Sequence, residues 1–314
     1  PKPGFHRVDP KLGRNAIAIS KGATRMLCEL NVQFDVLTHA CSWEGYDVLI
    51  LPDYVTADAD TCQRLRNHLD KGGRVIASAW SGLDPEGAGF PLSEWCADFA
   101  GDDPLDPAYF QPDPAISNGL PAMPMDFYGK GVQLSPRENA ETLAEVIAPY
   151  YNREFDGEHY SRYAPPDRPA GRPAVVRNAQ VTHISHTVFS SYHEVAWWAL
   201  RNLVGNLLND ALPTPLIKAP DLPSFARVTV MEQPGRRIVH ILAYVPEHRG
   251  AATDMIEEPA RVGDIDLALL RDGKTSSRVY LAPGKQELTW ENDGDYIHTT
   301  VPDVIGHAHV VFEE

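Results

Sequence analysis

The chain has 314 residues, of which 43% are apolar and 23% charged, and its formal net charge is −15 at pH 7. This length and composition exclude a disordered chain and leave room for two hydrophobic cores. The acidic charge argues against nucleic acid or an anionic membrane surface as partner, since phosphate contacts require clustered Lys and Arg. No apolar run approaches the roughly 20 residues of a membrane span, and no secretory leader opens the chain, so we expect a cytoplasmic location.

Four cysteines are spread over the first hundred residues: Cys28, Cys41, Cys62 and Cys96. None of them stands in CxxC or CxxH spacing, which argues against a zinc site or a disulfide scaffold. We therefore expect free thiols and neither a metal nor another cofactor.

The start of the chain lacks the strand that normally opens a doubly wound domain. The sequence begins at Pro1, and residues 1–13 are too polar and proline-rich for a buried strand. Apolar spacing predicts a helix over residues 14–30 and a strand over 33–38. We expect the chain to be a fragment of a longer polypeptide.

Residues 45–82 show the strongest local pattern, a strand, a helix and a second strand. Apolar runs at 46–51 and 74–79 are typical of strands buried on both faces of a parallel sheet. Between them Cys62, Leu65 and Leu69 recur at helical spacing, with Asp58 or Asp60 as a possible N-cap. This βαβ unit predicts a flavodoxin-like or amidotransferase-like α/β domain, a parallel sheet with helices on both faces.

The rest of the chain divides at a proline-rich stretch, residues 212–223. Before it, residues 83–115 and 118–130 have the composition of long loops, and residues 190–209 have a wide apolar helical face. After it the apolar period changes to two, and about seven short strands with Gly-containing turns predict a small antiparallel β-sandwich. The predicted domains are 1–217 and 218–314.

The turn at residues 79–82 is the first candidate for catalysis. Amidotransferase-like folds place a cysteine nucleophile on a sharp strand-to-helix turn at this point. Here the turn reads Ala-Trp-Ser-Gly, and Ser81 lacks the G-x-S-x-G context that activates a serine. We expect a structural turn, so amidotransferase or peptidase activity is not predicted.

The histidines are the second candidate. His183 and His186 stand three residues apart on a predicted strand, so their side chains are expected to face opposite ways. His307 and His309 share a strand face, but no third ligand stands near them in the sequence, and no metal site is predicted. His240 is expected to be a hydrogen-bonded residue of the sandwich.

The third candidate is a segment dense in aromatic, basic and amide side chains, residues 149–166. Sugar recognition combines aromatic faces with bidentate donors and acceptors, and this segment supplies both. The alternative is a loop packed by its own aromatic rings and ion-paired at Arg153 or Arg162. The candidate substrate-binding residues are Asn152, Arg153, His159, Tyr160 and Ser161, with Glu154, Arg162 and Tyr163 as weaker ones. No catalytic pair of carboxylates can be selected among 43 acidic residues.

Two parts of the sequence resemble known proteins. YDVLILPDYV and LRNHLDKGGRVIASAWSG resemble the trimerisation domain of large bacterial β-galactosidases. APYYNREFDGEHYSRYAPP, the segment from VVRNAQ to RNLV, RRIVHILAYVPEHRG and VPDVIGHAHVVFEE are similar to a related group of hypothetical glycosyl hydrolases and bacterial α-L-fucosidases. Arg162 and Tyr163 stand where that group has a His-centred continuation.

The resemblance implies a function shared with other domains. In that group a (β/α)₈ barrel precedes this region and carries the nucleophile and the general acid. The chain would then be the non-barrel part of an α-L-fucosidase-like glycoside hydrolase, inactive alone, that forms a homo-oligomer and completes an active site for a carbohydrate substrate. The alternative is a freestanding carbohydrate-binding or assembly protein.

Overall fold

The computed structural model describes residues 13–153 and 163–314, and the account below concerns these residues. The chain divides into two compact units. Unit 1 comprises Pro1–Met26 and Val36–Pro213, and unit 2 comprises Leu27–Asp35 and Thr214–Glu314. Each unit is described by itself.

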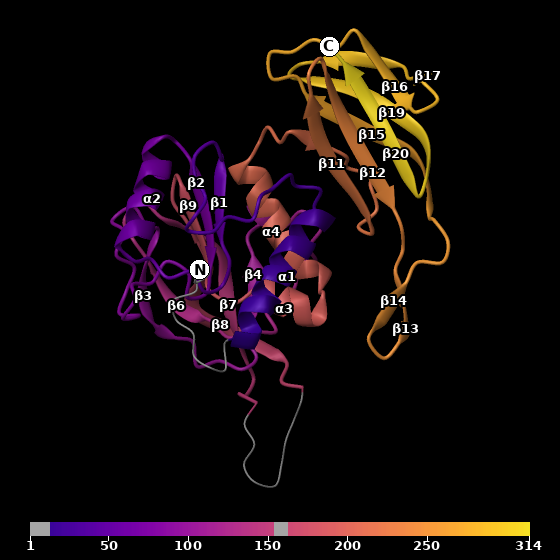
Figure 1. The fold of residues 1–314 in the computed structure, drawn as a ribbon. Helices are drawn as coiled ribbons and strands as arrows, with labels where there is room; N and C mark the ends of the chain where they lie inside the picture. The colour runs from indigo at the N-terminus through magenta and orange to yellow at the C-terminus, as the bar shows by residue number, and fades with distance from the viewer. Residues whose placement is uncertain (1–12, 154–162) are drawn as a thin grey trace. The chain divides into compact units, whose positions relative to one another are not determined.

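Four α-helices and one short 3₁₀ helix lie in the described part of the chain: α1 (Gly13–Glu29), α2 (Ala59–Asp70), α3 (Phe189–Val195), α4 (Trp198–Ala211) and η1 (Pro114–Ile116) (Figure 1). Across the described residues, none of the helices has both the length and the apolar character that crossing a membrane requires.

The expected βαβ unit is present in unit 1. Strands β1 (Val48–Leu51) and β2 (Arg74–Ser78) pair in parallel, with α2 between them in the chain. Asp58 caps α2 by accepting a hydrogen bond from the Thr61 amide at 2.9 Å. The helix ends before Gly72, whose φ of +87° favours glycine. Local sequence signals were therefore sufficient to locate this unit.

The predicted fold class is wrong for the sheet as a whole. The sheet has seven strands in the order β1-β2-β9-β8-β7-β4-β5, and only the pairs β1·β2 and β2·β9 are parallel. The remaining pairs are antiparallel, so this is a mixed sheet and not a flavodoxin-like or amidotransferase-like parallel sheet. Its other strands are β4 (Tyr109–Pro112), β5 (Met125–Asp126), β7 (Glu141–Pro149), β8 (Pro166–Arg177) and β9 (Val181–Ile184).

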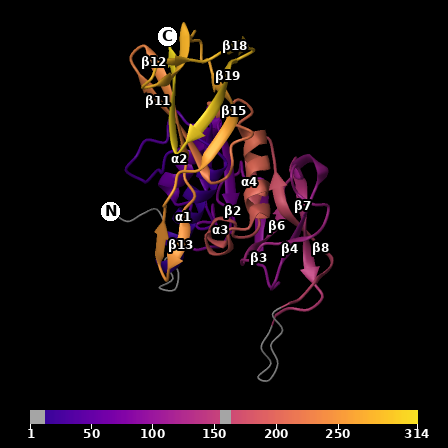
Figure 2. The ribbon, with the colours of Figure 1, turned by 90° about the vertical axis from the view of Figure 1, so that its right-hand side faces the viewer.

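Proline placement explains why the antiparallel half was missed. Strand β8 contains three prolines, each of which removes a backbone donor and suggests a loop. Its pairing with β7 shifts register at several points, so bulges accommodate these residues. Figure 2 shows β7 and β8 side by side.

Two other predicted elements differ from the structure. Residues 33–38 form no strand, and the helix expected over 190–209 is interrupted between α3 and α4. Ala196 lies at this junction with a φ of +48°, in the left-handed region that ends a helix. A separate small sheet pairs β3 (Ala97–Asp102) with β6 (Val132–Pro136).

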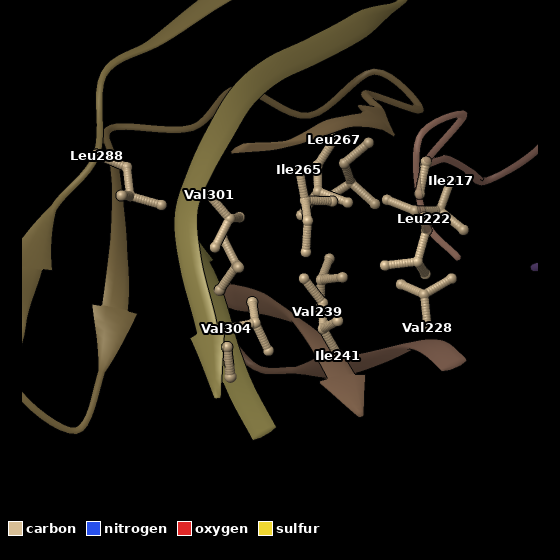
Figure 3. Packing of buried hydrophobic residues seen from close by; sticks show 14 of the residues in the cluster. Ile217, Leu222, Val228, Val239, Ile241, Ile265, Leu267, Leu288, Val301 and Val304 are labelled. Carbon is tan, nitrogen blue, oxygen red and sulfur yellow. The ribbon is translucent and has the colours of Figure 1, made fainter. Parts of the chain in front are cut away.

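Unit 2 consists mainly of antiparallel sheets. One has the order β10-β15-β19-β18, another β11-β12-β20-β16-β17, and β13 pairs with β14 in a hairpin. Val239, Ile241, Ile265 and Val301 belong to a hydrophobic core that both larger sheets share (Figure 3). The strands are β10 (Ile217–Lys218), β11 (Ala226–Gln233), β12 (Arg236–Ala243), β13 (Glu247–Gly250), β14 (Thr253–Met255), β15 (Arg261–Leu270), β16 (Arg278–Ala282), β17 (Gln286–Glu287), β18 (Trp290–Asp293), β19 (Tyr296–Ile305) and β20 (His307–Glu313).

The segment Leu27–Asp35 belongs to unit 2 because it satisfies the edge of β11. The Gln33 side-chain amide donates to the Val228 carbonyl at 3.1 Å and accepts from the Val230 amide at 2.9 Å. One glutamine thus pairs two backbone groups that an edge strand would otherwise leave to water.

A buried carboxylate joins distant parts of unit 1. Asp53 follows β1 and is fully buried, and its carboxylate accepts hydrogen bonds from the Ser78 hydroxyl and the Ser190 amide, both at 2.8 Å. The Ser190 hydroxyl and the amides of Val188 and Phe189 also donate to it. Burial raises the pKa of Asp53, and these hydrogen bonds oppose that rise. Through its hydrogen bonds to Ser78 and Ser190, the carboxylate fixes the end of β2 and the first turn of α3.

We predict that Asp53→Asn destabilises the protein by at least about 3 kcal/mol, because an amide nitrogen would face donors in a site that water does not reach. The measurement is the free energy of unfolding from urea titration. Asp84, whose carboxylate accepts from the Ala88 amide in an exposed turn, supplies the control, and Asp84→Asn should cost less than about 1 kcal/mol. Equal effects of the two substitutions would contradict the role assigned to Asp53.

Two buried histidines make stability depend on pH. Burial lowers the pKa of His183 and of His186 to about 4 in each case. The Trp95 indole donates to Nδ1 of His183 at 2.9 Å, and Nε2 of the same ring lies 2.9 Å from the Ala79 carbonyl. Since Nδ1 accepts, Nε2 carries the proton and the ring is neutral.

In the unfolded chain these histidines bind protons below about pH 6.5, whereas in the folded chain they do so only near pH 4. The unfolded state therefore gains protons first, and stability falls as the pH drops through this window. We predict a loss on the order of 2 kcal/mol per histidine between pH 7.5 and pH 5, measured by urea unfolding. His183→Gln should reduce this slope, and an unchanged slope would refute the assignment.

Candidate functional site

Three of the predicted sugar-contact residues lie in the described structure, at the two ends of one segment. Asn152 and Arg153 follow β7, and Tyr163 precedes β8. The predicted residues Glu154, His159, Tyr160, Ser161 and Arg162 lie outside the described residues. The description therefore concerns the base of this segment and the side chains around it.

Asn152 and Arg153 bind the loop that precedes β4. The Asn152 side chain accepts from the Asp106 amide at 3.1 Å and donates to the Pro104 carbonyl at 3.2 Å. Arg153 donates to Asp106 Oδ1 through Nη2 at 2.8 Å and through Nε at 3.2 Å. The Arg153 amide also donates to the Asp106 carbonyl at 2.6 Å. Both residues thus attach the chain after β7 to the loop 103–106.

Asp106 is held between two cations. Its Oδ2 accepts from the Lys130 ammonium at 2.7 Å, while Oδ1 accepts from Arg153. Partial burial acts to raise the pKa of Asp106, but the hydrogen bonds and charges of Lys130 and Arg153 outweigh it and lower the pKa. Asp106 is therefore ionised at neutral pH and balances two positive charges.

A second ion pair lies deeper, three residues earlier in the same loop. Arg172 of β8 donates to both oxygens of Asp103, at 2.6 and 3.0 Å, and the Asp103 side chain is fully buried. Such a two-point geometry fixes the guanidinium in one plane. Nε2 of His186 lies 3.7 Å from Asp103 Oδ2, and its ring stacks on Phe127 at a centroid distance of 4.4 Å. The loop 103–106 is thus anchored at both ends.

Asp126 adds a carboxyl group with the opposite pKa behaviour. It lies at the end of β5 and accepts from the Tyr128 amide at 2.7 Å. Burial raises the pKa of Asp126, while the charge of Arg153 lowers it in part. Two carboxyl groups whose pKa values shift in opposite directions around one arginine are typical of a functional site.

Exposed tyrosine rings flank the base of the segment. Tyr150 and Tyr163 are more than 70% exposed, and the rings of Tyr150 and Tyr151 meet edge to face at 6.3 Å. The Tyr151 hydroxyl donates to the Tyr163 carbonyl, which joins the two ends of the segment. The Tyr109 hydroxyl donates to the Ala164 carbonyl at 2.5 Å, and burial raises the pKa of Tyr109 to about 12. Exposed aromatic faces beside charged groups are available to stack on a ligand.

Sequence reasoning missed the acidic and basic partners of this site: Asp103, Asp106, Asp126, Lys130 and Arg172. The four at positions 103–130 stand in stretches that were interpreted as loops, and no spacing connects any of the five to Arg153. The only available signal was that an arginine with aromatic neighbours requires a carboxylate partner, which does not say which of 43 acids it is.

The turn after β2 has a structural role. Ser81 is buried, and its hydroxyl accepts from the Val55 amide at 3.0 Å. Ala79 has the strained backbone of this turn, with a φ of +49°, and presents only a methyl group. Trp80 stacks on Tyr54 at 4.6 Å and donates to Asp102 at 2.8 Å.

His307 and His309 have a third histidine beside them in the structure, although none stands near them in the sequence. Nδ1 of His240 lies 3.4 Å from Nε2 of His307, and its ring meets that of His309 edge to face at 4.6 Å. The three histidines form a single cluster on unit 2. Strand register, which sequence spacing does not reveal, brings His240 to the other two.

An apolar patch is exposed at the junction of α3 and α4. Val195 and Trp198 are exposed at the junction, and Tyr128 meets the Trp197 ring edge to face at 5.0 Å. We refer to Tyr128, Val195, Trp197 and Trp198 as the α3–α4 patch. Exposed tryptophan side chains are enriched at protein interfaces.

Solved structures of glycoside hydrolases are similar to this chain. An α-L-fucosidase, isoenzyme 2 from Paenibacillus thiaminolyticus, superimposes with a TM-score of 0.88 at 29% identity, over 94% of this chain and 45% of the fucosidase. The β-galactosidases of Rahnella sp. R3 and Bacillus circulans share the fold alone, with TM-scores of 0.59 and 0.56 at 16% and 15% identity. Each covers 94% of this chain, which spans 36% of the Rahnella protein and 37% of the Bacillus protein. The chain thus spans less than half the length of these relatives.

A search among curated proteins gave no match. The family model of the beta-galactosidase trimerisation domain matches residues 25–194, more than half of the chain, which confirms the resemblance inferred from the sequence. This chain therefore belongs to the β-galactosidase trimerisation domain family.

Proposed function

We propose that this chain serves a glycoside hydrolase in two ways, by assembling its subunits and by supplying the segment at Asn152 to a sugar-binding active site. The observation that carries the second role is the attachment of Asn152 and Arg153 to the loop 103–106, beside exposed tyrosine rings. The catalytic residues would belong to a barrel domain of the same protein.

The relatives support a carbohydrate substrate. The α-L-fucosidase similarity extends over nearly the whole chain with a TM-score of 0.88, so both units have counterparts in one glycosidase. An α-L-fucoside is therefore the proposed substrate class, and a β-galactoside is the one to compare with it.

The chemistry of the site supports the same substrate. Sugars present apolar ring faces that stack on tyrosine and hydroxyl groups that bind charged or amide side chains. Tyr150 and Tyr163 offer exposed rings on both sides of the segment 154–162, and Asp126 offers a carboxyl with a raised pKa. Arg153 acts as a positioning residue, because its guanidinium is directed at Asp106.

The family description supports the assembly role. The α3–α4 patch supplies a suitable surface, since Trp198 and Val195 are each more than 40% exposed. A second copy of the chain that covers this patch would remove these side chains from water.

For the sugar-binding role we predict that Arg153→Ala lowers kcat/KM by roughly 10- to 100-fold in the protein that carries the catalytic domain, because hydrogen bonds to a charged group are lost at the base of the segment. The measurement uses 4-nitrophenyl α-L-fucoside and 4-nitrophenyl β-D-galactoside. Asp106→Asn should have a similar effect, and the double variant should lose little more than either single one, because one ion pair is removed in each case.

Arg168→Ala is the matched control, since Arg168 is exposed and its guanidinium pairs with the neighbouring Asp167, away from Asp106. It should leave kcat/KM unchanged. If Arg153→Ala and Asp106→Asn also leave kcat/KM unchanged on both substrates, the segment has no part in the active site.

For the assembly role we predict that the chain forms a trimer, measured by size-exclusion chromatography with light scattering. Trp198→Glu should weaken association by more than about tenfold, because it places a charge in the centre of an apolar interface. Glutamate is tolerated at the first turn of α4, so the fold should persist. Met231→Glu, at a residue that is 52% exposed in unit 2, is the control. A strictly monomeric chain would contradict the role.

A further inference from the structure

Three histidines of unit 2 meet through the register of two antiparallel strands. In the pairing of β12 with β20, His240 stands directly opposite His309, and Leu242 stands opposite His307. His307 is therefore the diagonal neighbour of His240, and His307 and His309 are two residues apart on one strand. Figure 1 shows the two strands side by side.

All three side chains project from the same face of the sheet. Val239 and Ile241 of β12, and Ala308 and Val310 of β20, belong to the hydrophobic core. Because successive side chains of a strand alternate between faces, His240, His307 and His309 are directed away from that core. His240 and His309 are half-buried and His307 is exposed, so solvent reaches the cluster. The rings of His240 and His307 each contact that of His309.

A glycine fixes where β20 begins. Gly306 has a φ of +72°, and a Cβ atom at this position would lie 2.7 Å from the Tyr244 hydroxyl oxygen and 2.8 Å from Cβ of Pro259. Only glycine fits both the conformation and the space. The chain passes here from β19 of one sheet to β20 of the other, so His307 is held at the first position of its strand.

The distances suit a transition metal. One ligand nitrogen from each ring can be chosen so that all three lie within 4.8 Å of one another, and Nδ1 of His240 lies 3.4 Å from Nε2 of His307. Two nitrogens bound to a tetrahedral Zn²⁺ at about 2.0–2.1 Å are about 3.3–3.4 Å apart. In the described part of the chain no other group of three His, Cys, Asp or Glu side chains has this geometry.

We propose that His240, His307 and His309 form a binding site for a divalent transition-metal ion, with Zn²⁺ as the ion of choice. Imidazole nitrogen is the ligand that Zn²⁺, Cu²⁺ and Ni²⁺ share, whereas Mg²⁺ and Ca²⁺ prefer oxygen. Three protein ligands leave the fourth tetrahedral position to water or to a group from outside the chain. The site does not depend on the function proposed above.

The competing explanation is a cluster held together by the rings alone. A hydrogen bond between Nδ1 of His240 and Nε2 of His307 would account for the distance of 3.4 Å, and the edge-to-face contact of His309 with His307 would account for their centroid distance of 4.0 Å. This arrangement needs no ion, so metal affinity distinguishes the two.

The experiment is isothermal titration calorimetry of the untagged, chelator-treated chain with ZnCl₂ at pH 7.5, where imidazole ligands are mostly deprotonated. We expect one Zn²⁺ per chain with micromolar or tighter affinity, and no heat of binding with MgCl₂ in its place. His240→Gln and His309→Gln should each weaken Zn²⁺ binding by at least about 100-fold, since loss of even an outer-shell partner costs roughly 10- to 100-fold.

Two controls keep the result interpretable. His298→Gln changes a histidine of β19, in the other sheet, and His248→Gln changes one that pairs with Asp254 at 2.9 Å in the β13–β14 hairpin. Both should retain full affinity. Thermal unfolding of each variant without metal checks the fold, and the visible absorption of bound Co²⁺ should show tetrahedral coordination. Absence of Zn²⁺ binding at micromolar concentration, or affinity that survives His240→Gln and His309→Gln together, would overturn the proposal.

Discussion

The carboxylate of Asp53 is the constraint on which unit 1 depends. It lies at the carboxyl end of β1, and its donors come from the end of β2 and from the first turn of α3, more than 130 residues later in the chain. A carboxylate oxygen at a helix N-terminus satisfies backbone amides that have no partner inside the helix. In α/β enzymes the carboxyl end of such a strand often carries a catalytic residue. Here Asp53 stands at that end of β1 and holds β2 and α3 together.

Ion pairs likewise fix the loop 103–106, one of them buried and the other partly exposed. The pair of Asp103 with Arg172 is buried, so removal of one partner would leave an uncompensated charge, whereas the pair of Asp106 with Arg153 is partly solvated and contributes less to stability. The inner pair thus holds the loop in place, and the outer pair holds Arg153 against that loop. This division favours a positioning role for Arg153, whose geometry matters more than its contribution to stability.

Local patterns were sufficient for part of this fold and insufficient for the rest. The βαβ unit follows from apolar runs, an N-cap and a glycine stop, all within forty residues. The antiparallel half of the sheet could not be located in this way. The prolines of β8 suggest a loop, and its strand character comes from tertiary pairing with β7, where bulges interrupt the register, and with β9. Ala196 interrupts an otherwise continuous helical pattern, because its backbone lies in the left-handed region. Alanine usually favours a helix, so its identity does not predict this break. The composition of 149–166 indicated Asn152 and Arg153, but their partners became evident only from tertiary contacts.

The histidine cluster also could not be predicted from the sequence alone. His307 and His309 share a strand face at a spacing that any reader of the sequence can see, while His240 stands 67 residues before His307 on a different strand. Alternation places each side chain on a face, but only the register of β12 against β20 decides which residues of that face are neighbours. A shift of one residue would move His240 into the core, and a shift of two toward the end of β20 would place it opposite Val311 instead of His309. The site therefore exists only in the folded unit, and its chemistry is a property of the strand pairing.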